Sequence, residues 1–365
     1  MKLLRFGLAL LIITLGACAS AWCTRDSSGA ADSASAPKPP IHLHVVGGLA
    51  DVHQYQRHEV PFWTERVKAI TGGRVTADIV PFDKAGVPGN DILRLMSVGA
   101  MPFGTALLGV SSSMDPEFGA IDLAGLNPNM ATLRRSTDML RGPLEQVLRE
   151  RYGLRLLALY AYPAQLIFCK EPFSSLRDLA GRRVRTATPS QSDFVEALGA
   201  RAVRTPFSDV ISNIKTGNTA CALTGSMSGN TIGLHKVTRY LSPLTVSWGM
   251  SLFAANEAAW QALPPDVRQV LTDELRKLEA DVWAEAGRET KEGIDCDVGA
   301  GTCVNGTPGQ MILVPIAPED LALQADEFKS AVLPRWFMRC GDPCKHLWDM
   351  RSRPVQKSAA TPTTR

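Results

Sequence analysis

Two hydrophobic periodicities alternate along most of the chain. The segment 41–46 (IHLHVV) has a period of two, which is typical of a strand. Val60, Trp63 and Val67 then recur at the spacing of one helix face. Similar strand and helix patterns follow in turn as far as residue 224. Strands that alternate with helices imply βαβ units, so we expect an α/β fold with mostly parallel sheets.

One helical pattern is much longer than the others. It begins after Pro264-Pro265 and continues to Gly293, with apolar residues at helical spacing. About 28 residues at 1.5 Å per residue span about 42 Å, which is more than a single domain requires. A length of 365 residues also allows two domains. We therefore expect this helix to brace two domains.

The first 17 residues have the pattern of an export signal. Lys2 and Arg5 precede an apolar run of about ten residues, which is half the length of a membrane span. The run ends in the string LGAC, which resembles the box of bacterial lipoproteins in which the cysteine, here Cys18, is lipidated. We therefore predict a signal peptide over 1–17. Cleavage after Ala21 is the alternative, and it would leave no lipid anchor.

Composition excludes nucleic acid as a partner. Without Lys2 and Arg5 of the leader, 37 basic residues face 36 acidic ones, so no basic surface is expected. No second stretch reaches the length of a membrane span. The segment 18–40 is rich in Ser, Ala and Pro and predicts a flexible linker, and the composition of 350–365 predicts a disordered tail.

Six cysteines remain beyond the leader and the linker. An even number in an exported chain indicates disulfides, and six cysteines allow 15 pairings. Sequence alone cannot choose strictly among them, but the short spacings favour Cys296–Cys303 and Cys340–Cys344, which leaves Cys169–Cys221. The alternative is a zinc site beside His346, but its C-x3-C spacing differs from the usual C-x2-C knuckle. We expect neither a metal nor a cofactor.

Several blocks match one known family in order and spacing. The strongest is LRDLAGRRVR at 176–185, which matches a D-L-x-G-x-K/R-h-R motif. The string TGGRV at 71–75 matches another. The string NEAAWQALP at 256–264 resembles a family string N-x-x-W-x-x-L-P, with one additional residue between Asn256 and Trp260. Over roughly 41–349, the chain resembles the substrate-binding proteins of TRAP transporters, the tripartite ATP-independent periplasmic carriers.

The resemblance implies a two-domain periplasmic binding protein fold with a hinge and a long helix that braces both domains. Domain I would comprise 41–162 and 248–293, and domain II 163–247 and 294–349. The implied function is to capture a small organic acid between the domains and deliver it to the small and large membrane subunits of a transporter. The resemblance thus implies a periplasmic monomer that is not an enzyme. The alternatives are a ligand receptor for a sensor system and a secreted enzyme on a similar fold.

The resemblance assigns the clamp of a substrate carboxylate to Arg185, the last arginine of the strongest block. A guanidinium suits this role because its planar fork of donors fits both carboxylate oxygens and stays charged when desolvated. The alternative is one more surface charge beside Arg182 and Arg183. Gln165 stands where many members carry a second arginine. This difference puts in doubt that the chain shares the sugar-acid specificity of those members.

The other candidate ligand-binding residues follow strands or lie between the expected domains, where open α/β sheets bind ligands. Gln165 could donate to a polar ligand. The ring of Trp248 could either form part of the wall of the site or pack in the core. The remaining candidates are Tyr162, Thr224, Gly225, Ser226, Asp51 and Tyr55. No catalytic residue is expected, because the chain contains no G-x-S-x-G, P-loop or G-x-G-x-x-G motif after a strand.

Overall fold

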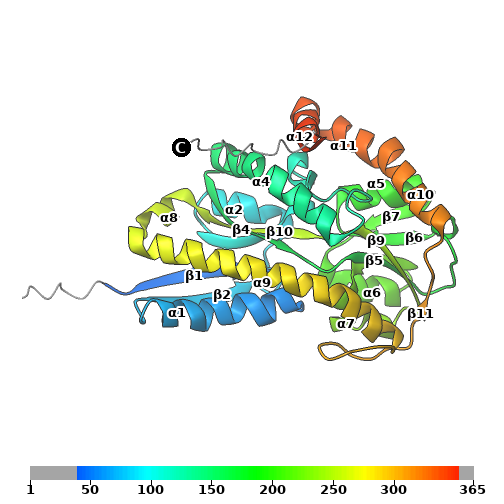
Figure 1. Cartoon of the computed structure of the whole chain (residues 1–365), viewed down its shortest axis with the longest axis horizontal. Helices are drawn as coiled ribbons and strands as arrows, with labels where there is room; N and C mark the ends of the chain where they lie inside the picture. The colour runs from blue at the N-terminus through cyan, green and yellow to red at the C-terminus, as the bar shows by residue number, and fades with distance from the viewer. Residues whose placement is uncertain (1–38, 353–365) are drawn as a thin grey trace, which may run out of the picture. The chain divides into compact units, whose positions relative to one another are not determined.

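Two mixed β-sheets form the framework of the chain (Figure 1). The computed structural model describes residues 39–352, so the predicted signal peptide, most of the linker and Cys18 lie outside it. The first sheet has the order β2-β1-β3-β10-β4. Its strands are β1 (Ile41–Gly47), β2 (Val75–Pro81), β3 (Phe103–Leu107), β4 (Leu154–Ala161) and β10 (Met250–Asn256). β1 runs parallel to β2 and β3, whereas β10 is antiparallel to both of its neighbours.

The second sheet has the order β11-β9-β5-β8-β6-β7. Its strands are β5 (Gln165–Cys169), β6 (Arg183–Thr186), β7 (Arg201–Arg204), β8 (Cys221–Gly225), β9 (Tyr240–Ser247) and β11 (Ile312–Leu313). β6 is parallel to β7 and β8, and β9 is parallel to β11, but β5 is antiparallel to both neighbours. The α/β class is confirmed. β5 and β10 run antiparallel because the chain reaches each of them directly from the other sheet, without a crossover helix.

Two short connections carry the chain between the sheets, at 162–164 and 248–249. They are joined to each other, since Tyr162 N donates to Gly249 O at 3.1 Å and Gln165 Nε2 donates to Trp248 O at 3.0 Å. The domain boundaries predicted from the sequence fall at these connections. The division into domains at these residues stays a prediction.

The long helix α9 (Pro265–Val298) has 34 residues, slightly more than predicted. Leu271, Leu275 and Val282 pack in one hydrophobic cluster with β1, β3 and β10 of the first sheet. Near its other end, the buried Gly293 lies against the backbone of α7 (Ser226–Thr231), which follows β8 of the second sheet. Figure 1 shows α9 running from the first sheet to α7. The predicted long helix is therefore confirmed, with one end on each half of the chain.

The remaining helices cover the sheets and their edges. The α-helices are α1 (Val67–Ile70), α2 (Ile92–Ser97), α3 (Leu108–Ser111), α4 (Met130–Tyr152), α5 (Pro189–Ala197), α6 (Val210–Lys215), α8 (Glu257–Ala262), α10 (Pro318–Glu327), α11 (Leu333–Cys340) and α12 (Asp342–Ser352). Short 3-10 and π-helical segments are η1 (Gln54–Glu59), η2 (Phe62–Arg66), η3 (Gly89–Asp91), η4 (Pro116–Gly119), η5 (Leu176–Leu179), η6 (Phe207–Asp209), η7 (Leu234–Lys236) and η8 (Phe328–Val332).

The sequence predicts a disordered tail from residue 350, but helix α12 extends to Ser352. Residues 350–352 belong to α12, which packs against α4. Met350 contacts the hydrophobic core, and Arg351 Nε donates to Ser136 Oγ at 3.2 Å, so these residues have tertiary partners that composition does not reveal. The rest of the predicted tail lies outside the described residues.

The six cysteines form three disulfides, Cys169–Cys221, Cys296–Cys303 and Cys340–Cys344, so the predicted pairs are confirmed. Cys169 and Cys221 occupy directly opposed positions on β5 and β8, so the first bridge fastens the middle of the second sheet. A zinc site at Cys344 is wrong, because that sulfur is bonded to Cys340.

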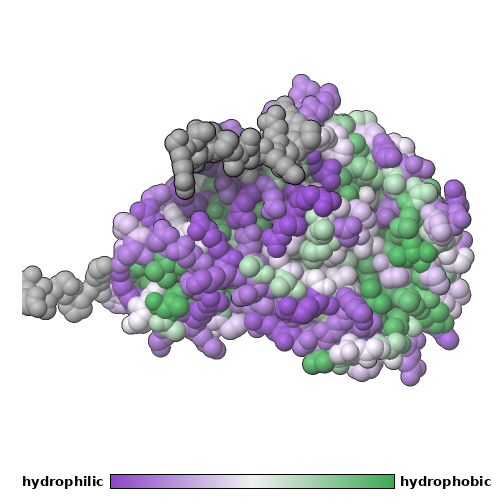
Figure 2. Space-filling view, in the orientation of Figure 1, coloured by the Kyte–Doolittle hydropathy of each residue, from purple (hydrophilic) through white to green (hydrophobic). Residues whose placement is uncertain are grey.

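The surface along α9 is hydrophilic, whereas apolar residues gather where β11 and α10 lie (Figure 2). Ile312, Leu313 and Leu321 are among the exposed apolar residues there. Between residues 39 and 352, no helix combines the length and the apolar character needed to cross a bilayer.

Candidate functional site

A cavity of about 340 Å³ is lined by residues from both sheets. On the first-sheet side, Leu107, Leu108 and Val110 line it where β3 ends and α3 begins. On the second-sheet side, its wall includes Arg185 of β6 and Thr224 of β8. Concave sites of this size commonly hold small ligands, particularly near the ends of strands.

Most of the cavity wall is apolar. Its charged groups are the buried Arg185, the exposed Arg204, and the carboxylates of Asp83 and Asp122. Uncharged polar side chains line it as well, namely those of Asn90, Ser113, Gln165, Thr188, Gln191, Thr205, Ser208, Thr224, Ser228 and Ser247. The apolar side chains are those of Leu49, Val52, Phe82, Leu107, Leu108, Val110, Phe118, Ile121, Phe207 and Met250. Such a wall favours a ligand with a substantial apolar body.

Arg185 lies in the cavity wall and is only 2% exposed. Its Nη1 donates to Leu223 O at 2.8 Å, and its Nη2 and Nε donate to Thr205 O at 2.9 and 3.2 Å. Burial lowers the pKa of Arg185 to about 10, against a weaker opposite effect of Asp209. The side chain still carries its positive charge at neutral pH.

The guanidinium keeps unused donor capacity. Of its five N–H groups, three donate to backbone carbonyls, so two remain. Within residues 39–352, Arg185 forms no ion pair with a carboxylate. A buried cation is costly without a counter-charge, and an anionic ligand in the cavity would supply one. The alternative of a surface charge is wrong, because Arg185 is buried while Arg183 is exposed.

Gln165 also lines the cavity, but its donors are already used. Its Nε2 donates to Pro163 O at 3.1 Å and to Trp248 O at 3.0 Å. Its Oε1 is therefore the atom with capacity to bind a ligand, as an acceptor. The expectation that Gln165 donates to a ligand stays a prediction, and it would require one of these two hydrogen bonds to break.

Three further predicted binding residues, Tyr162, Thr224 and Gly225, lie in the cavity wall, and their role in binding stays a prediction. The hydroxyl of Tyr162 is buried and has no hydrogen-bond partner among residues 39–352, and burial strongly raises its pKa. The next residue after Gly225 is different. Ser226 lies outside the lining, where its Oγ donates to Glu289 O at 3.1 Å and its amide donates to Ala164 O.

Three other candidates lie elsewhere in the structure. The ring of Trp248 packs in the core, and its Nε1 donates to Asn127 O at 2.9 Å. Asp51 is exposed and pairs with Lys84. Tyr55 is buried, and its Oη lies 3.4 Å from Ile79 O. None of the three lines the cavity, because each side chain is held by contacts within the fold.

Sequence reasoning missed Asp122 and Phe207 in the wall. Asp122 accepts hydrogen bonds from the amides of Trp248 and Gly249 at 2.8–3.2 Å, and burial raises its pKa to about 6. No motif surrounds Asp122 in the sequence. Phe207 begins the string FSDV at 207–210, a further string that resembles the TRAP substrate-binding proteins, and that string could have indicated it.

The loop that follows β1 supplies two apolar residues of the cavity wall, Leu49 and Val52. Glu59 holds this loop in place. Its carboxylate accepts from Gly48 N and Gln54 Nε2, each at 2.7 Å. The side chain is 1% exposed, and burial raises its pKa to about 7, against the opposite effect of these hydrogen bonds.

We expect the raised pKa of Glu59 to make the protein less stable as the pH rises from about 4.5 to about 7. In this window the folded state holds a proton on Glu59 that the unfolded state has released, so raising the pH favours unfolding. Glu59→Gln should reduce this slope in urea unfolding at pH 5 and pH 7.5. Glu257→Gln is the control, since hydrogen bonding from Arg155 lowers the pKa of Glu257 and places its effect below this window. An unchanged slope in Glu59→Gln would contradict the prediction.

Comparison with known proteins identifies the family of this chain. The model of bacterial extracellular solute-binding protein family 7 (DctP) matches residues 47–302, which is more than half of the chain. The chain belongs to this family. The predicted family is thereby confirmed, and its members are extracytoplasmic solute receptors.

Relatives of this family 7 chain share its fold at low sequence identity. DctP7 of Bordetella pertussis, a receptor that binds pyroglutamic acid, has a TM-score of 0.76 and 22% identity, with 86% of this chain and 99% of DctP7 covered. A TRAP solute-binding protein from Desulfovibrio salexigens with bound orotic acid has a TM-score of 0.73 and 14% identity, with 85% and 97% covered.

One curated relative of the family 7 chain is the ectoine-binding periplasmic protein TeaA of Halomonas elongata. It is 23% identical over 202 residues, which cover 54% of this chain. The chain spans 59% of the length of TeaA.

Proposed function

We propose that this chain is a periplasmic receptor that captures a small carboxylic acid at Arg185 and delivers it to the membrane subunits of a TRAP transporter. The buried guanidinium of Arg185 carries the proposal, because it combines a cavity position, a positive charge and two unused N–H groups. Relatives that bind pyroglutamic and orotic acid support it. The chain acts by binding, without catalysis, and lipid on Cys18 is part of the proposal.

The ligand is a monocarboxylate with an apolar body. One buried cation can pair with one carboxylate, and the apolar side chains that dominate the rest of the wall gain from contact with hydrocarbon. A second carboxylate beside Asp83 or Asp122 would be disfavoured by their negative charge, and the other cation of the wall, Arg204, is exposed, where an ion pair contributes little. Densely hydroxylated acids gain less from this wall, because hydroxyls that face its apolar side chains are left without partners.

Capture involves closure of two domains, 41–162 with 248–293 and 163–247 with 294–349, about the connections between the sheets. The cavity wall draws on both sets of residues, so a bound acid contacts both domains at once. A ligand that makes more contacts in a closed arrangement shifts the population toward it.

A panel of matched compounds tests this function by thermal shift and calorimetry. The probes are 4-methylpentanoate and its uncharged amide, pyroglutamate, orotate, succinate and galacturonate. We expect 4-methylpentanoate to bind at least about tenfold more tightly than its amide, since a charge-assisted hydrogen bond contributes about 1.5–3 kcal/mol. We also expect succinate and galacturonate to bind more weakly than the apolar monocarboxylates.

The two parts of the proposal fail differently. Equal binding of the acid and its amide, or binding of no acid in the panel, would overturn capture of carboxylates. Preference for succinate or galacturonate over every apolar monocarboxylate would overturn only the ligand class. Mass spectrometry of the small molecules released from the denatured protein gives an independent answer, because it identifies any acid that copurifies.

A further inference from the structure

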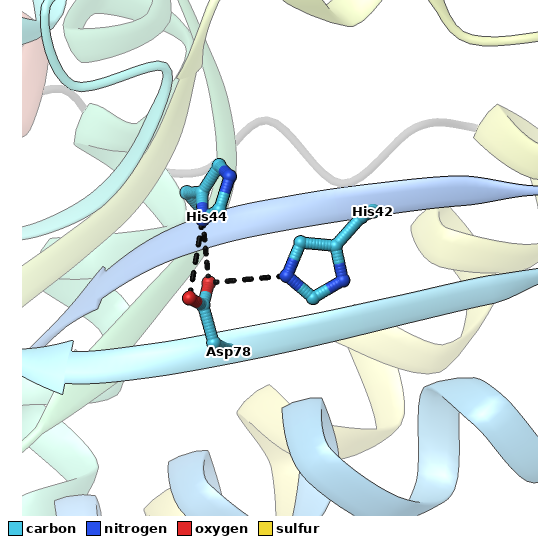
Figure 3. A group of neighbouring side chains, drawn as sticks. All are labelled: His42, His44 and Asp78. Atoms are coloured by element: carbon cyan, nitrogen blue, oxygen red, sulfur yellow. Dashed lines mark hydrogen bonds and ion pairs between the residues drawn. The ribbon is translucent and has the colours of Figure 1, made fainter.

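We propose that His42, His44 and Asp78 form a binding site for one divalent transition-metal ion of the zinc type, on the outer face of the first sheet. The two histidines lie on β1 and the aspartate on β2, the neighbouring edge strand. Figure 3 shows the three side chains directed toward one another above these strands. None of them lines the cavity, so this site is separate from the one at Arg185.

The strand geometry places the histidines side by side. Residues two apart on a strand point to the same face. Leu43 and Val45 are buried beneath β1, so His42 and His44 both project to the opposite, exposed face. The parallel register places Asp78 next to His44. The side chains of His42, His44 and Asp78 are 49%, 74% and 57% exposed, so an ion can reach all three from solvent.

The donor atoms are close enough to share one ion. His44 Nδ1 lies 2.9 Å from Asp78 Oδ1, and His42 Nε2 lies 3.7 Å from the same oxygen. One donor atom from each residue lies within 4.8 Å of the other two. Tetrahedral zinc with ligands at about 2.0–2.2 Å needs donors about 3.3–3.6 Å apart, a range that the two measured separations bracket. The donors of the two histidines also lie within 4.8 Å of each other, so side-chain rotation can bring all three donors around one ion.

Thr76 orients the imidazole of His42 for metal binding. The Thr76 hydroxyl lies 3.5 Å from Ile41 O, to which it donates, so its oxygen can accept from His42 Nδ1 at 2.8 Å. With the proton on Nδ1, the unprotonated Nε2 faces Asp78 and is available to a metal. A hydrogen bond from the second ring nitrogen is the usual support of a metal-bound histidine.

The donor set selects the kind of ion. Two imidazoles and one carboxylate suit zinc, nickel or copper, whereas magnesium and calcium prefer sets made of oxygen alone. Three protein ligands leave a fourth position to water. An ion held here links β1 to the edge strand β2 and favours the folded state by mass action.

Calorimetric titration of the tag-free, chelator-treated protein with Zn²⁺ and with Mg²⁺ tests the proposal. We expect one saturable Zn²⁺ site and no matching Mg²⁺ site. His42→Ala, His44→Ala and Asp78→Asn should each weaken Zn²⁺ binding at least about tenfold, since even loss of an outer hydrogen bond costs about 10–100-fold. Thr76→Val should also weaken it, through the orientation of His42.

His346→Ala is the matched control, because His346 is exposed on α12, outside the site. Its affinity for Zn²⁺ should equal that of the unmodified protein, and circular dichroism should show that every variant folds. The proposal is overturned if no saturable Zn²⁺ site exists, or if the His42 and His44 variants bind Zn²⁺ as tightly as the unmodified protein.

Discussion

Arg185→Ala is expected to weaken binding of the tightest acid of the panel at least about 100-fold. The variant removes the two N–H groups that remain for a ligand, and charge-assisted hydrogen bonds contribute about 1.5–3 kcal/mol each. Two such bonds correspond to a factor of about 100 or more, because 1.4 kcal/mol is a factor of ten. Calorimetry measures the affinity directly.

Two companion variants make this result specific. Arg183→Ala removes an exposed arginine two residues earlier on β6, whose side chain donates to Gly217 O, and it should leave affinity unchanged. Arg185→Lys keeps the charge but loses the planar fork, so its affinity should fall between those of Arg185→Ala and the unmodified protein. Unchanged affinity in a folded Arg185→Ala variant would remove the basis of the proposed function.

Gly293→Ala is expected to destabilise the protein by about 1–3 kcal/mol, the usual cost of overpacking a core. A Cβ at this position would lie 2.6 Å from the backbone carbon of Ser226 and still closer to the amide nitrogen of Met227. Both atoms belong to the backbone of α7 and cannot rotate away. The variant therefore has to separate α9 from α7.

Gly287→Ala, six residues earlier on α9, is the matched control. A Cβ there meets nothing within 4 Å, so the exchange should be neutral or should stabilise by up to about 1 kcal/mol, because alanine is the better helix former. Urea unfolding compares the two variants. Gly293→Ala should also weaken ligand binding, since Ser228 of α7 lies in the cavity wall. Equal stability of the two variants would contradict close packing of α9 on α7.

Most strands and the long helix could be predicted from the sequence, but α4 could not. Its buried face includes Ser136 and Thr137 among the leucines, and Pro143 lies inside the helix. Polar residues at core positions break the apolar period, and an internal proline predicts a helix end. Tertiary contacts make the polar residues acceptable at these buried positions, since Ser136 Oγ donates to Asn127 Oδ1 at 2.8 Å.

Residues of the candidate site could be predicted only where they belong to a family motif. Arg185 is one of three arginines in the string RRVR, and the resemblance, not the spacing, singled it out before the structure placed it in the cavity wall. Trp248 and Tyr55 were placed in the site on position alone. Aromatic residues serve cores as readily as sites, and hydrogen bonds of the two side chains to Asn127 O and Ile79 O hold them within the fold.

In the proposed closure, the paired connections between the sheets would act together as a two-stranded ribbon. The bonds from Tyr162 N to Gly249 O and from Gln165 Nε2 to Trp248 O resist sliding of one connection past the other, but they allow both to flex together. Gln165 belongs to this ribbon and to the cavity wall at once. In the proposed closure, a ligand bound at its Oε1 would thus be one amide group away from the connections about which the domains move.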